Sequence, residues 1–326
     1  MRFLIYTFLS LFILLGSTGA VFFLAQKEFI SESSLPADVR VLIPRGSGFS
    51  KAVDILAENK IIANPYIFKF FAYSNGDAAR VKAGEYLFTK NISPKSALQI
   101  LVDGKVVIHK VTFPEGLNVR EIVEILIKEQ YLEGDVPENI EEGSLLPETY
   151  NFIYGDTRAS IVKRMQEKMQ QTLLELWEKR QKNLPIASKE QAIILASIVQ
   201  KEIGAKDEMA RVAGVFINRL KIGMRLQSDP TVVYGIEKAT GKPMDRALLS
   251  LDLKIPTVYN TYTIESLPPT PIANPSRMAI EAVLNPLPTN ELYFVATGSG
   301  GHNFAVTLDE HNKNVQKYRE KNRQQQ

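Results

Sequence analysis

The chain has 326 residues, enough for one large or two medium domains, and its 45% hydrophobic and 23% charged residues are ordinary for a globular protein. It contains no cysteine, which excludes disulfides, thiolate metal sites and a lipid-modified cysteine anchor. A net charge of +3 gives no reason to expect a nucleic-acid partner, and with three histidines we expect neither a metal site nor a cofactor.

The N-terminal segment is the strongest signal in the composition. No charged residue occurs from Phe3 to Leu24, and at about 1.5 Å per residue this stretch spans a hydrocarbon core of roughly 30 Å. The alternative is a cleaved signal peptide, with Thr18-Gly19-Ala20 as its cleavage site. Because the apolar run is long and resumes beyond this site, we expect residues 1–25 to stay in the lipid bilayer as a transmembrane anchor. Arg2 predicts a cytoplasmic N-terminus, with the remainder periplasmic or otherwise extracytoplasmic.

The next region contains an internal repeat. Residues 26–38 are polar and serine-rich and are predicted to form a linker. Residues 41–62 and 111–132 then share the order Val, Pro, Gly and a Val-acidic-Ile-Leu run. Each copy predicts a strand, a Pro-x-Gly turn and an amphipathic helix. The residues expected on the buried helix faces are Val53, Leu56 and Ala57 in one copy and Val123, Leu126 and Ile127 in the other.

Further elements complete an α+β region over residues 39–155. The stretch "AGEYLF" predicts a strand, and "SPKSALQILVDGK" predicts a helix that has Pro94 in its first turn and ends at Gly104. A long charged helix is expected after this region, from about Ala159 to Lys182.

The C-terminal half, residues 156–326, is predicted to be mostly helical. One helix over residues 189–203 begins with a capping box, Ser188-x-x-Gln191, and is expected to end at Gly204. A second helix, within "KDEMARVAGVFINRLKIG", forms a hairpin with it. "LYFVATG" predicts a strand, and "HNFAVTLDEHNKNVQKYREKN" predicts a turn followed by a terminal helix.

Glu202 stands in the last turn of the first of these helices. The spacing puts Gln191, Leu195, Ile198 and Glu202 on one helix face. Burial on this face and the negative end of the helix dipole both disfavour the ionised carboxylate, so both raise its pKa. An acid that keeps its proton near neutral pH is suited to general acid catalysis. The alternative is a solvated carboxylate that pairs with one of three nearby cations, Lys201, Lys206 or Arg211.

Two later stretches, "MRLQSDPTVVYG" and "TVYNTYTIESLPP", are rich in hydroxyl and amide groups. Asp229-Pro230 is typical of a helix start, with Asp229 as N-cap and Pro230 in the first position, which gives Asp229 a structural role. Aromatic residues mixed with asparagine are typical of carbohydrate clefts, although alternating tyrosines are equally typical of a half-buried strand. The side chains expected to bind a sugar are Gln227, Ser228, Tyr234, Tyr259, Asn260 and Tyr262.

Several long motifs, in this order, resemble the endolytic murein transglycosylases of the MltG/YceG type: "LLPETYNF", "ASIVQKE", "VAGVFINRL", "GMRLQSDPTVVYG", "YNTYTIESLPPTPIANP" and "LYFVATGSGGHNF". The resemblance covers nearly the whole chain after the anchor. It implies a single-pass enzyme of the inner (cytoplasmic) membrane, with a LysM-like α+β region over residues 39–155 and a lysozyme-like catalytic domain over residues 156–326. It places the catalytic acid at Glu202 and adds Asn303 to the substrate-binding residues. Gln200 stands where family members often carry a second acid.

The resemblance also implies a reaction without water. Lytic transglycosylases cleave the β-1,4 bond between N-acetylmuramic acid and N-acetylglucosamine in peptidoglycan and leave 1,6-anhydromuramoyl ends. Glu202 would act first as acid and then as base. The cut would terminate elongation of a nascent glycan strand, with peptidoglycan synthases as partners.

Two other interpretations of the function stay open. One is a muramidase that hydrolyses the same bond, for which Asp229 is the only nearby candidate for a second carboxylate. The other is a non-catalytic anchored scaffold that binds glycan, for which Gln200 in place of an acid is the only support.

Overall fold

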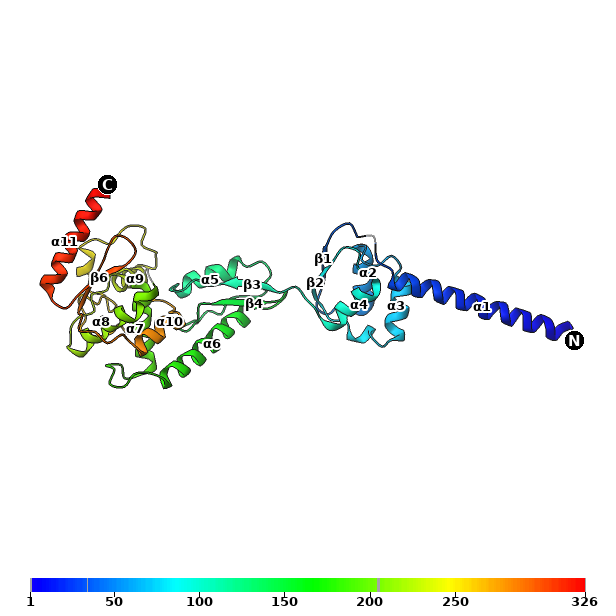
Figure 1. Cartoon of the computed structure of the whole chain (residues 1–326), viewed down its shortest axis with the longest axis horizontal. Helices are drawn as coiled ribbons and strands as arrows, with labels where there is room; N and C mark the ends of the chain where they lie inside the picture. Colours follow the sequence, from blue (N-terminus) through cyan, green and yellow to red (C-terminus); the bar gives the residue numbers. More distant parts are fainter. Residues whose placement is uncertain (1, 34, 204–205, 326) are drawn as a thin grey trace. The chain divides into compact units, whose positions relative to one another are not determined.

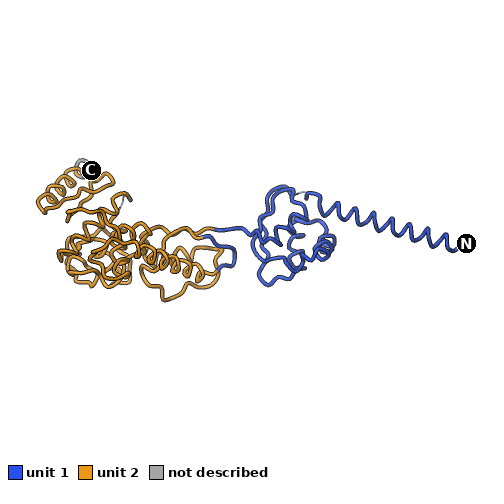
Figure 2. Tube along the Cα trace, turned by 60° about the horizontal axis from the view of Figure 1, so that its bottom comes forward, with its two compact units in different colours: residues 1–109, 151–156 blue, residues 110–150, 157–326 orange. Residues whose placement is uncertain are grey.

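The computed structural model describes residues 2–33, 35–203 and 206–325 (Figure 1). Its contacts divide the chain into two compact units (Figure 2): unit 1 is Met1–His109 with Asn151–Asp156, and unit 2 is Lys110–Tyr150 with Thr157–Gln326. The predicted α+β class is confirmed as a mostly helical chain whose described strands pair in two-stranded sheets. The predicted domain limits and the LysM-like and lysozyme-like assignments stay predictions.

Unit 1 carries the N-terminal helix and a small α+β body. Its elements are α1 (Arg2–Ile30), β1 (Val39–Ile43), α2 (Phe49–Glu58), α3 (Pro65–Ser74), the 3-10 turn η1 (Ala78–Arg80), β2 (Gly84–Phe88) and α4 (Pro94–Asp103). β1 and β2 pair antiparallel, with Val41 opposite Tyr86. The predicted strand and the predicted Pro94 helix are thus confirmed as β2 and α4. Gly104 ends α4 in the left-handed conformation, at a φ of +71°.

The core of unit 1 lies between its helices and the β1–β2 pair. Leu56 of α2, Phe68 of α3 and Leu101 of α4 are buried in it together. The segment expected as a linker contributes as well, since Phe29 and Leu35 are buried in the same cluster. This follows from the length of α1, which continues without a break through Ile30 instead of ending at the end of the apolar run.

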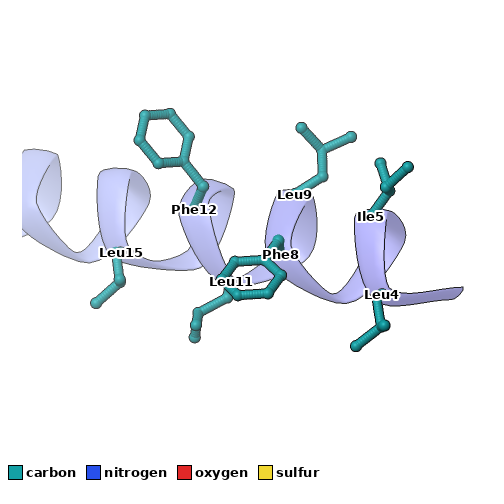
Figure 3. A pocket seen from close by; sticks show the side chains of 7 residues that line it. All are labelled: Leu4, Ile5, Phe8, Leu9, Leu11, Phe12 and Leu15. Atoms are coloured by element: carbon teal, nitrogen blue, oxygen red, sulfur yellow. The ribbon is translucent and has the colours of Figure 1, made fainter. Parts of the chain in front are cut away.

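α1 is the one helix in the described part of the chain that is long and apolar enough to cross a membrane, over Phe3–Ile30. Figure 3 shows its apolar side chains, Phe8 and Phe12 among them, projecting from the helix. They cover no core of the protein, because the side chain of Phe12, for example, is 77% exposed. Length and composition fit both a retained anchor and a signal sequence.

Unit 2 holds most of the remaining helices. Its elements are α5 (Val119–Lys128), α6 (Arg158–Glu178), α7 (Lys189–Glu202), the 3-10 turn η2 (Lys206–Glu208), α8 (Met209–Lys221), α9 (Asp229–Thr240), the 3-10 turn η3 (Asp252–Lys254), α10 (Arg277–Leu284), β5 (Tyr293–Ala296), β6 (His302–Ala305) and α11 (Leu308–Gln325). β3 (His109–Thr112) and β4 (Thr149–Phe152) pair with each other, and the division between the units falls within both strands.

Two of the predicted elements of unit 2 need correction in their bounds or type. α6 ends at Glu178 and not at Lys182. β6 is a strand where the sequence predicted a turn, because Asn303 and its neighbours find backbone partners on β5, opposite Val295. The strand expected in "LYFVATG" is confirmed as β5, and the terminal helix is confirmed as α11.

The internal repeat is present in both copies, one in each unit. Gly46 and Gly116 close the two turns in the left-handed conformation with the same φ of +79°. In α2, Val53 and Leu56 are buried as predicted, whereas Ala57 is partly buried and packs against the same core. In α5, Leu126 is buried as predicted, but Ile127 is 61% exposed and Ile122 is buried, so the prediction is wrong at Ile127. Two adjacent stripes of α5 are apolar, and the spacing alone does not select between them.

α7 is the central helix of unit 2, with α8 and α10 packed against it. The sequence predicted one apolar face, but every residue from 192 to 199 is buried. α7 is therefore a core helix, apolar around its whole circumference. Ser188 accepts a hydrogen bond from the backbone N–H of Gln191 as predicted, whereas the Gln191 side chain accepts from the N–H of Ala187 and does not complete the capping box. Gly204, the predicted helix stop, lies outside the described residues.

Candidate active site

Glu202 is the last residue of α7, and Ile203 after it is already extended. The Glu202 side chain is partly exposed. Its Oε1 atom accepts a hydrogen bond from Oγ of Ser228 at 2.5 Å. Among the described residues this hydroxyl is the one hydrogen-bond donor to the carboxyl group. Ser228 therefore holds one carboxyl oxygen, and the side chain remains partly exposed to solvent.

Burial raises the pKa of Glu202 to about 7 from its ordinary value of 4.5, with loss of hydration as the largest cause. The hydrogen bond from Ser228 opposes this shift, the negative charge of Asp229 adds to it, and the positive charge of Arg219 opposes it. The predicted direction of the pKa is thus confirmed. A carboxyl with a pKa near 7 can both hold and release a proton at neutral pH.

Ser228 is fixed by a buried set of hydroxyl groups. Its own side chain is 1% exposed, and its backbone N–H donates to Oγ1 of Thr261 at 2.9 Å. Thr231 Oγ1 donates to the carbonyl oxygen of Ser228 at 2.6 Å and lies 2.8 Å from Thr261 Oγ1. The two threonines therefore hold the loop before α9 against the 257–263 segment. Sequence reasoning missed them, because nothing along the chain indicates that these distant threonines meet.

The predicted role of Asp229 as a helix cap is wrong. Asp229 is the first residue of α9, and the N-cap position belongs to Ser228, whose side chain makes no capping hydrogen bond. The Ser228 hydroxyl is instead directed at Glu202. Asp229 is exposed, and its Oδ1 accepts a hydrogen bond from the Tyr262 hydroxyl at 2.6 Å. Asp229 and Tyr262 thus form a polar pair beside the Glu202–Ser228 pair.

The other residues predicted to bind substrate differ in how much polar surface they present. Gln227 is exposed and adopts a left-handed backbone, at a φ of +52°. Asn260 is fully buried, and its amide donates to the carbonyl oxygens of Leu253 and Ile255, so its polar groups hold the loop together. Asn303 lies on β6. The substrate-binding roles of these residues stay predictions.

Tyr234 and Tyr259 form an aromatic pair, with ring centres 5.0 Å apart and edge-to-face geometry. Tyr259 is buried, and its hydroxyl accepts from Lys238 Nζ at 2.9 Å and lies 2.7 Å from Thr270 Oγ1. Tyr234 is half-buried, and its hydroxyl donates to Oε2 of Glu142 at 3.4 Å. These contacts give Tyr259 a packing role and place Tyr234 beside a second acid.

Glu142 is a second partly exposed acid with a shifted pKa. The sequence analysis did not single it out, because it lies in the acidic run "EEG" with nothing to distinguish it. Burial raises its pKa to about 7, with loss of hydration as the largest cause. Its carboxyl accepts from the backbone N–H of Val119 and from Nδ2 of Asn274, both at 3.0 Å, as well as from Tyr234. With Tyr234 and Lys238 it borders a pocket of about 220 Å³.

Gln200 does not face the same surroundings as Glu202. Its Oε1 accepts from the backbone N–H of Ser276 at 3.1 Å and from the Ser276 hydroxyl at 2.7 Å. Ser276 is the N-cap of α10, so Gln200 ties the end of α7 to the start of α10. The side chain therefore serves packing between helices.

The fold and this arrangement define a mostly helical α+β protein that carries a partly exposed carboxyl group of raised pKa beside several hydroxyl groups. The chain belongs to the YceG-like family, whose model matches residues 41–317. It is 31% identical over 318 residues to the endolytic murein transglycosylase of Bacillus subtilis. The alignment covers 88% of this chain and 86% of the relative.

Two further comparisons agree with this membership. The endolytic murein transglycosylase of Streptococcus pneumoniae serotype 2 is 27% identical, over 93% of this chain and 63% of its own length. The crystal structure of a YceG-like protein from Listeria monocytogenes is 28% identical and superposes with a TM-score of 0.50, over 85% of this chain and 98% of that one.

Proposed function

We propose that this chain is a membrane-anchored endolytic lytic transglycosylase that cuts the glycan strands of peptidoglycan. The names of its curated relatives supply the reaction class. The observation that carries the proposal is the state of Glu202: a partly exposed carboxyl at the end of a core helix, with a pKa of about 7 and one described hydrogen-bond donor. A carboxyl group in this state can give a proton and later take one back.

In the first step, Glu202 acts as a general acid. Its carboxyl proton passes to the oxygen of the β-1,4 bond between N-acetylmuramic acid and N-acetylglucosamine, and the bond from that oxygen to C1 breaks. The N-acetylglucosamine side leaves as a free hydroxyl, and positive charge develops at C1 of the muramoyl sugar. Loss of hydration favours the protonated acid before this step, since it disfavours the carboxylate.

In the second step, the same carboxylate acts as a base. It takes the proton of the muramoyl C6 hydroxyl, whose oxygen attacks C1 and closes the 1,6-anhydro ring. The proton given in the first step is thereby regained, and no water is consumed. The Ser228 hydroxyl donates to this carboxylate and holds one of its oxygens in place between the two steps.

The groups next to Glu202 suit a sugar substrate. Tyr262 and Asp229 present a hydroxyl and a carboxylate joined by a 2.6 Å hydrogen bond, and Gln227 presents an exposed amide. These groups can hold the hydroxyl and N-acetyl groups of a glycan, and the negative charge of Asp229 favours the positive charge that develops at C1.

Hydrolysis is the second candidate, and one observation favours it. Asp229 does not cap α9, so its carboxylate is available, and its charge acts on Glu202. Inverting and retaining hydrolases both need a second carboxylate near the general acid. A muramidase would use Asp229 to activate water or to attack C1.

The proposed location follows from α1. We propose that it stays as a single-pass anchor, with a cytoplasmic N-terminus. Unit 2 and the rest of unit 1 then lie outside the cytoplasm, where peptidoglycan and its synthases are found. A reporter fused after Lys27 should then be active only outside the cytoplasm. Activity inside, or a mature chain that begins after Ala20, would show that α1 is not such an anchor.

Product analysis tests the proposed reaction. The purified full-length chain is incubated with peptidoglycan glycan strands, and the new ends are identified by mass spectrometry. Lytic cleavage yields 1,6-anhydromuramoyl ends, which are lighter by one water than the reducing ends that hydrolysis yields. New reducing ends would establish the muramidase, and intact strands would establish the non-catalytic scaffold.

A further inference from the structure

Helix α3 presents an aromatic face that unit 1 does not cover. Phe68 and Ala72 point into the core of the unit and are buried. On the other side, Tyr66 is 84% exposed, Phe70 52% and Tyr73 61%. Their spacing of four and three residues puts the three rings on one helix face. Leaving such a face in water is unfavourable, because each ring is a large apolar surface.

This aromatic face of α3 is continuous with the apolar surface of α1. The ring of Phe22 on α1 lies 6.5 Å from that of Phe70 and 6.0 Å from that of Phe71. Further along α1, Phe29 stacks on Phe71 at 4.5 Å. A groove of about 470 Å³ lies between the two helices, and Ser17 and Val21 of α1 line it together with Tyr66 and Phe70.

The position along α1 sets the depth at which α3 meets the bilayer. The apolar run ends at Ala25, three residues after Phe22, so Phe22 lies about 4–5 Å inside the edge of the hydrocarbon core. Ser17 lies about 12 Å inside the same edge, by the same rise per residue. The groove that Tyr66 lines therefore reaches from the edge into the outer part of the hydrocarbon layer.

The chemistry of the face fits this depth. Tyrosine is enriched where membrane meets water, since its ring is apolar and its hydroxyl can stay in the headgroup layer. α3 contains no acidic residue, and its one charged residue, Lys69, pairs with Asp54 of α2 at 3.8 Å, so the face carries no unpaired charge of its own. An interfacial helix typically buries its apolar face by roughly 5–10 Å.

We propose that the aromatic face of α3, made of Tyr66, Phe70 and Tyr73, is a lipid-contact surface that lies in the interfacial layer of the membrane crossed by α1. This inference rests on the proposed retention of α1 as an anchor. Because α1 enters unit 1 as an unbroken helix and Phe29 locks it to α3, the surface holds unit 1 flush against the membrane.

The absence of native cysteine allows a direct test in the full-length protein. Single variants Phe12→Cys, Phe70→Cys, Tyr73→Cys and Leu87→Cys are labelled with a small environment-sensitive dye and reconstituted in vesicles of phosphatidylcholine and phosphatidylglycerol. Leu87 is the matched control, since it is 41% exposed and belongs to β2. In Figure 1, β2 lies on the side of unit 1 away from the free end of α1. Spin-labelled lipids then quench the dye, with the nitroxide near the headgroup or near the bilayer centre.

We expect strong quenching at position 12 by the deep nitroxide, strong quenching at positions 70 and 73 by the shallow one, and little quenching at position 87 by either. Adding Phe70→Ser to Tyr73→Cys should reduce the quenching at position 73 by the shallow nitroxide. Adding Phe70→Ser to Phe12→Cys should leave the quenching at position 12 by the deep nitroxide unchanged. Quenching at position 12 with positions 70 and 73 as weak as 87 overturns the proposal. Loss of quenching at position 12 shows instead that α1 is not a membrane span, which contradicts the proposed anchor.

Two further outcomes are informative. If the dyes at 70 and 73 respond to protein density in the vesicles and not to the nitroxide lipids, the face binds a second copy of the chain, and the lipid proposal is wrong. If the shallow quenching at 70 and 73 persists when phosphatidylglycerol is replaced by phosphatidylcholine, the aromatic rings make the contact, as expected where Asp54 already pairs with Lys69.

Discussion

Glu202 and Glu142 are two acids of unit 2 that loss of hydration brings to a pKa of about 7, yet their carboxyl groups have different surroundings. Glu142 is held by donors from three separate segments, at Val119, Tyr234 and Asn274. Glu202 has one described donor, Ser228. Burial therefore sets the pKa in both places, whereas the number of committed hydrogen bonds decides whether a carboxyl can exchange its proton with a substrate. On this reasoning we propose that Glu142 joins segments of the fold and that Glu202 is the acid–base group.

The largest expected effect separates the two acids directly. Glu202→Gln keeps the size of the side chain but cannot transfer a proton, so turnover of glycan strands should fall by roughly 10²- to 10⁴-fold. Glu142→Gln should lower turnover far less. Both variants are compared with wild type in one release assay, with thermal unfolding as the control for folding. Equal losses in the two folded variants would remove the distinction between the acids.

The pH dependence of turnover should follow Glu202 alone. The first step needs the protonated acid, so kcat/KM should decline above pH 7 by about tenfold per pH unit in wild type. Glu142→Gln should show the same decline at the same pH. A decline that moves or disappears in this variant would mean that Glu142 is the titrating acid.

Glu142 should affect the pH dependence of the free energy of unfolding and not that of turnover. Its folded pKa of about 7 exceeds the ordinary 4.5, so the folded state retains a proton that the unfolded state loses between these values. The free energy of unfolding therefore falls as pH rises from 4.5 to 7 and stays lower above. Glu142→Gln should remove the part of this fall that Glu142 causes and leave the part that Glu202 causes. It should also cost about 1–3 kcal/mol at low pH, because an amide nitrogen then faces donors. Denaturant unfolding at several pH values checks both effects, and an unchanged slope would exclude Glu142 as a contributor.

Asp229→Asn should have a smaller effect. The charge of Asp229 raises the pKa of Glu202, so the neutral variant should show the decline in kcat/KM at a lower pH than wild type. The amide oxygen that this substitution introduces can still accept the hydrogen bond from Tyr262. A pH–rate profile measures the shift. Abolished turnover in a folded Asp229→Asn protein would support the hydrolytic mechanism.

Gln200→Glu should have the smallest effect. A carboxylate at this position can accept the same two hydrogen bonds from Ser276, and negative charge is favourable at the N-terminus of α10. Turnover should stay within about twofold of wild type, as for a substitution worth about 0.5 kcal/mol. Strong activation of turnover by this change would mean that an acid at position 200 takes part in catalysis.

Local signals in the sequence were sufficient for elements whose ends depend on neighbouring residues. Pro94 and Gly104 bound α4 as predicted, since first-turn prolines and left-handed stops involve only nearby backbone. The position of Glu202 at the end of α7 and the direction of its pKa followed from the same kind of pattern.

The surroundings of Glu202 could not be read from such patterns. Asp229 was expected to cap α9, but Ser228 takes the cap position and gives its hydroxyl to Glu202. The Thr231–Thr261 contact joins side chains 30 residues apart, and Glu142 meets Asn274 across 132 residues. Tertiary packing creates these contacts, and residue spacing along one segment carries no information about them.

The central claim is that one carboxyl cleaves the glycan bond without water, and digestion in ¹⁸O-labelled water tests it most directly. Wild-type protein is incubated with glycan strands in this solvent, and the new ends are weighed by mass spectrometry. We predict 1,6-anhydromuramoyl ends that contain no ¹⁸O, formed by wild type and absent with Glu202→Gln. Reducing ends that carry ¹⁸O, or unlabelled anhydro ends formed equally fast by Glu202→Gln, would contradict the account.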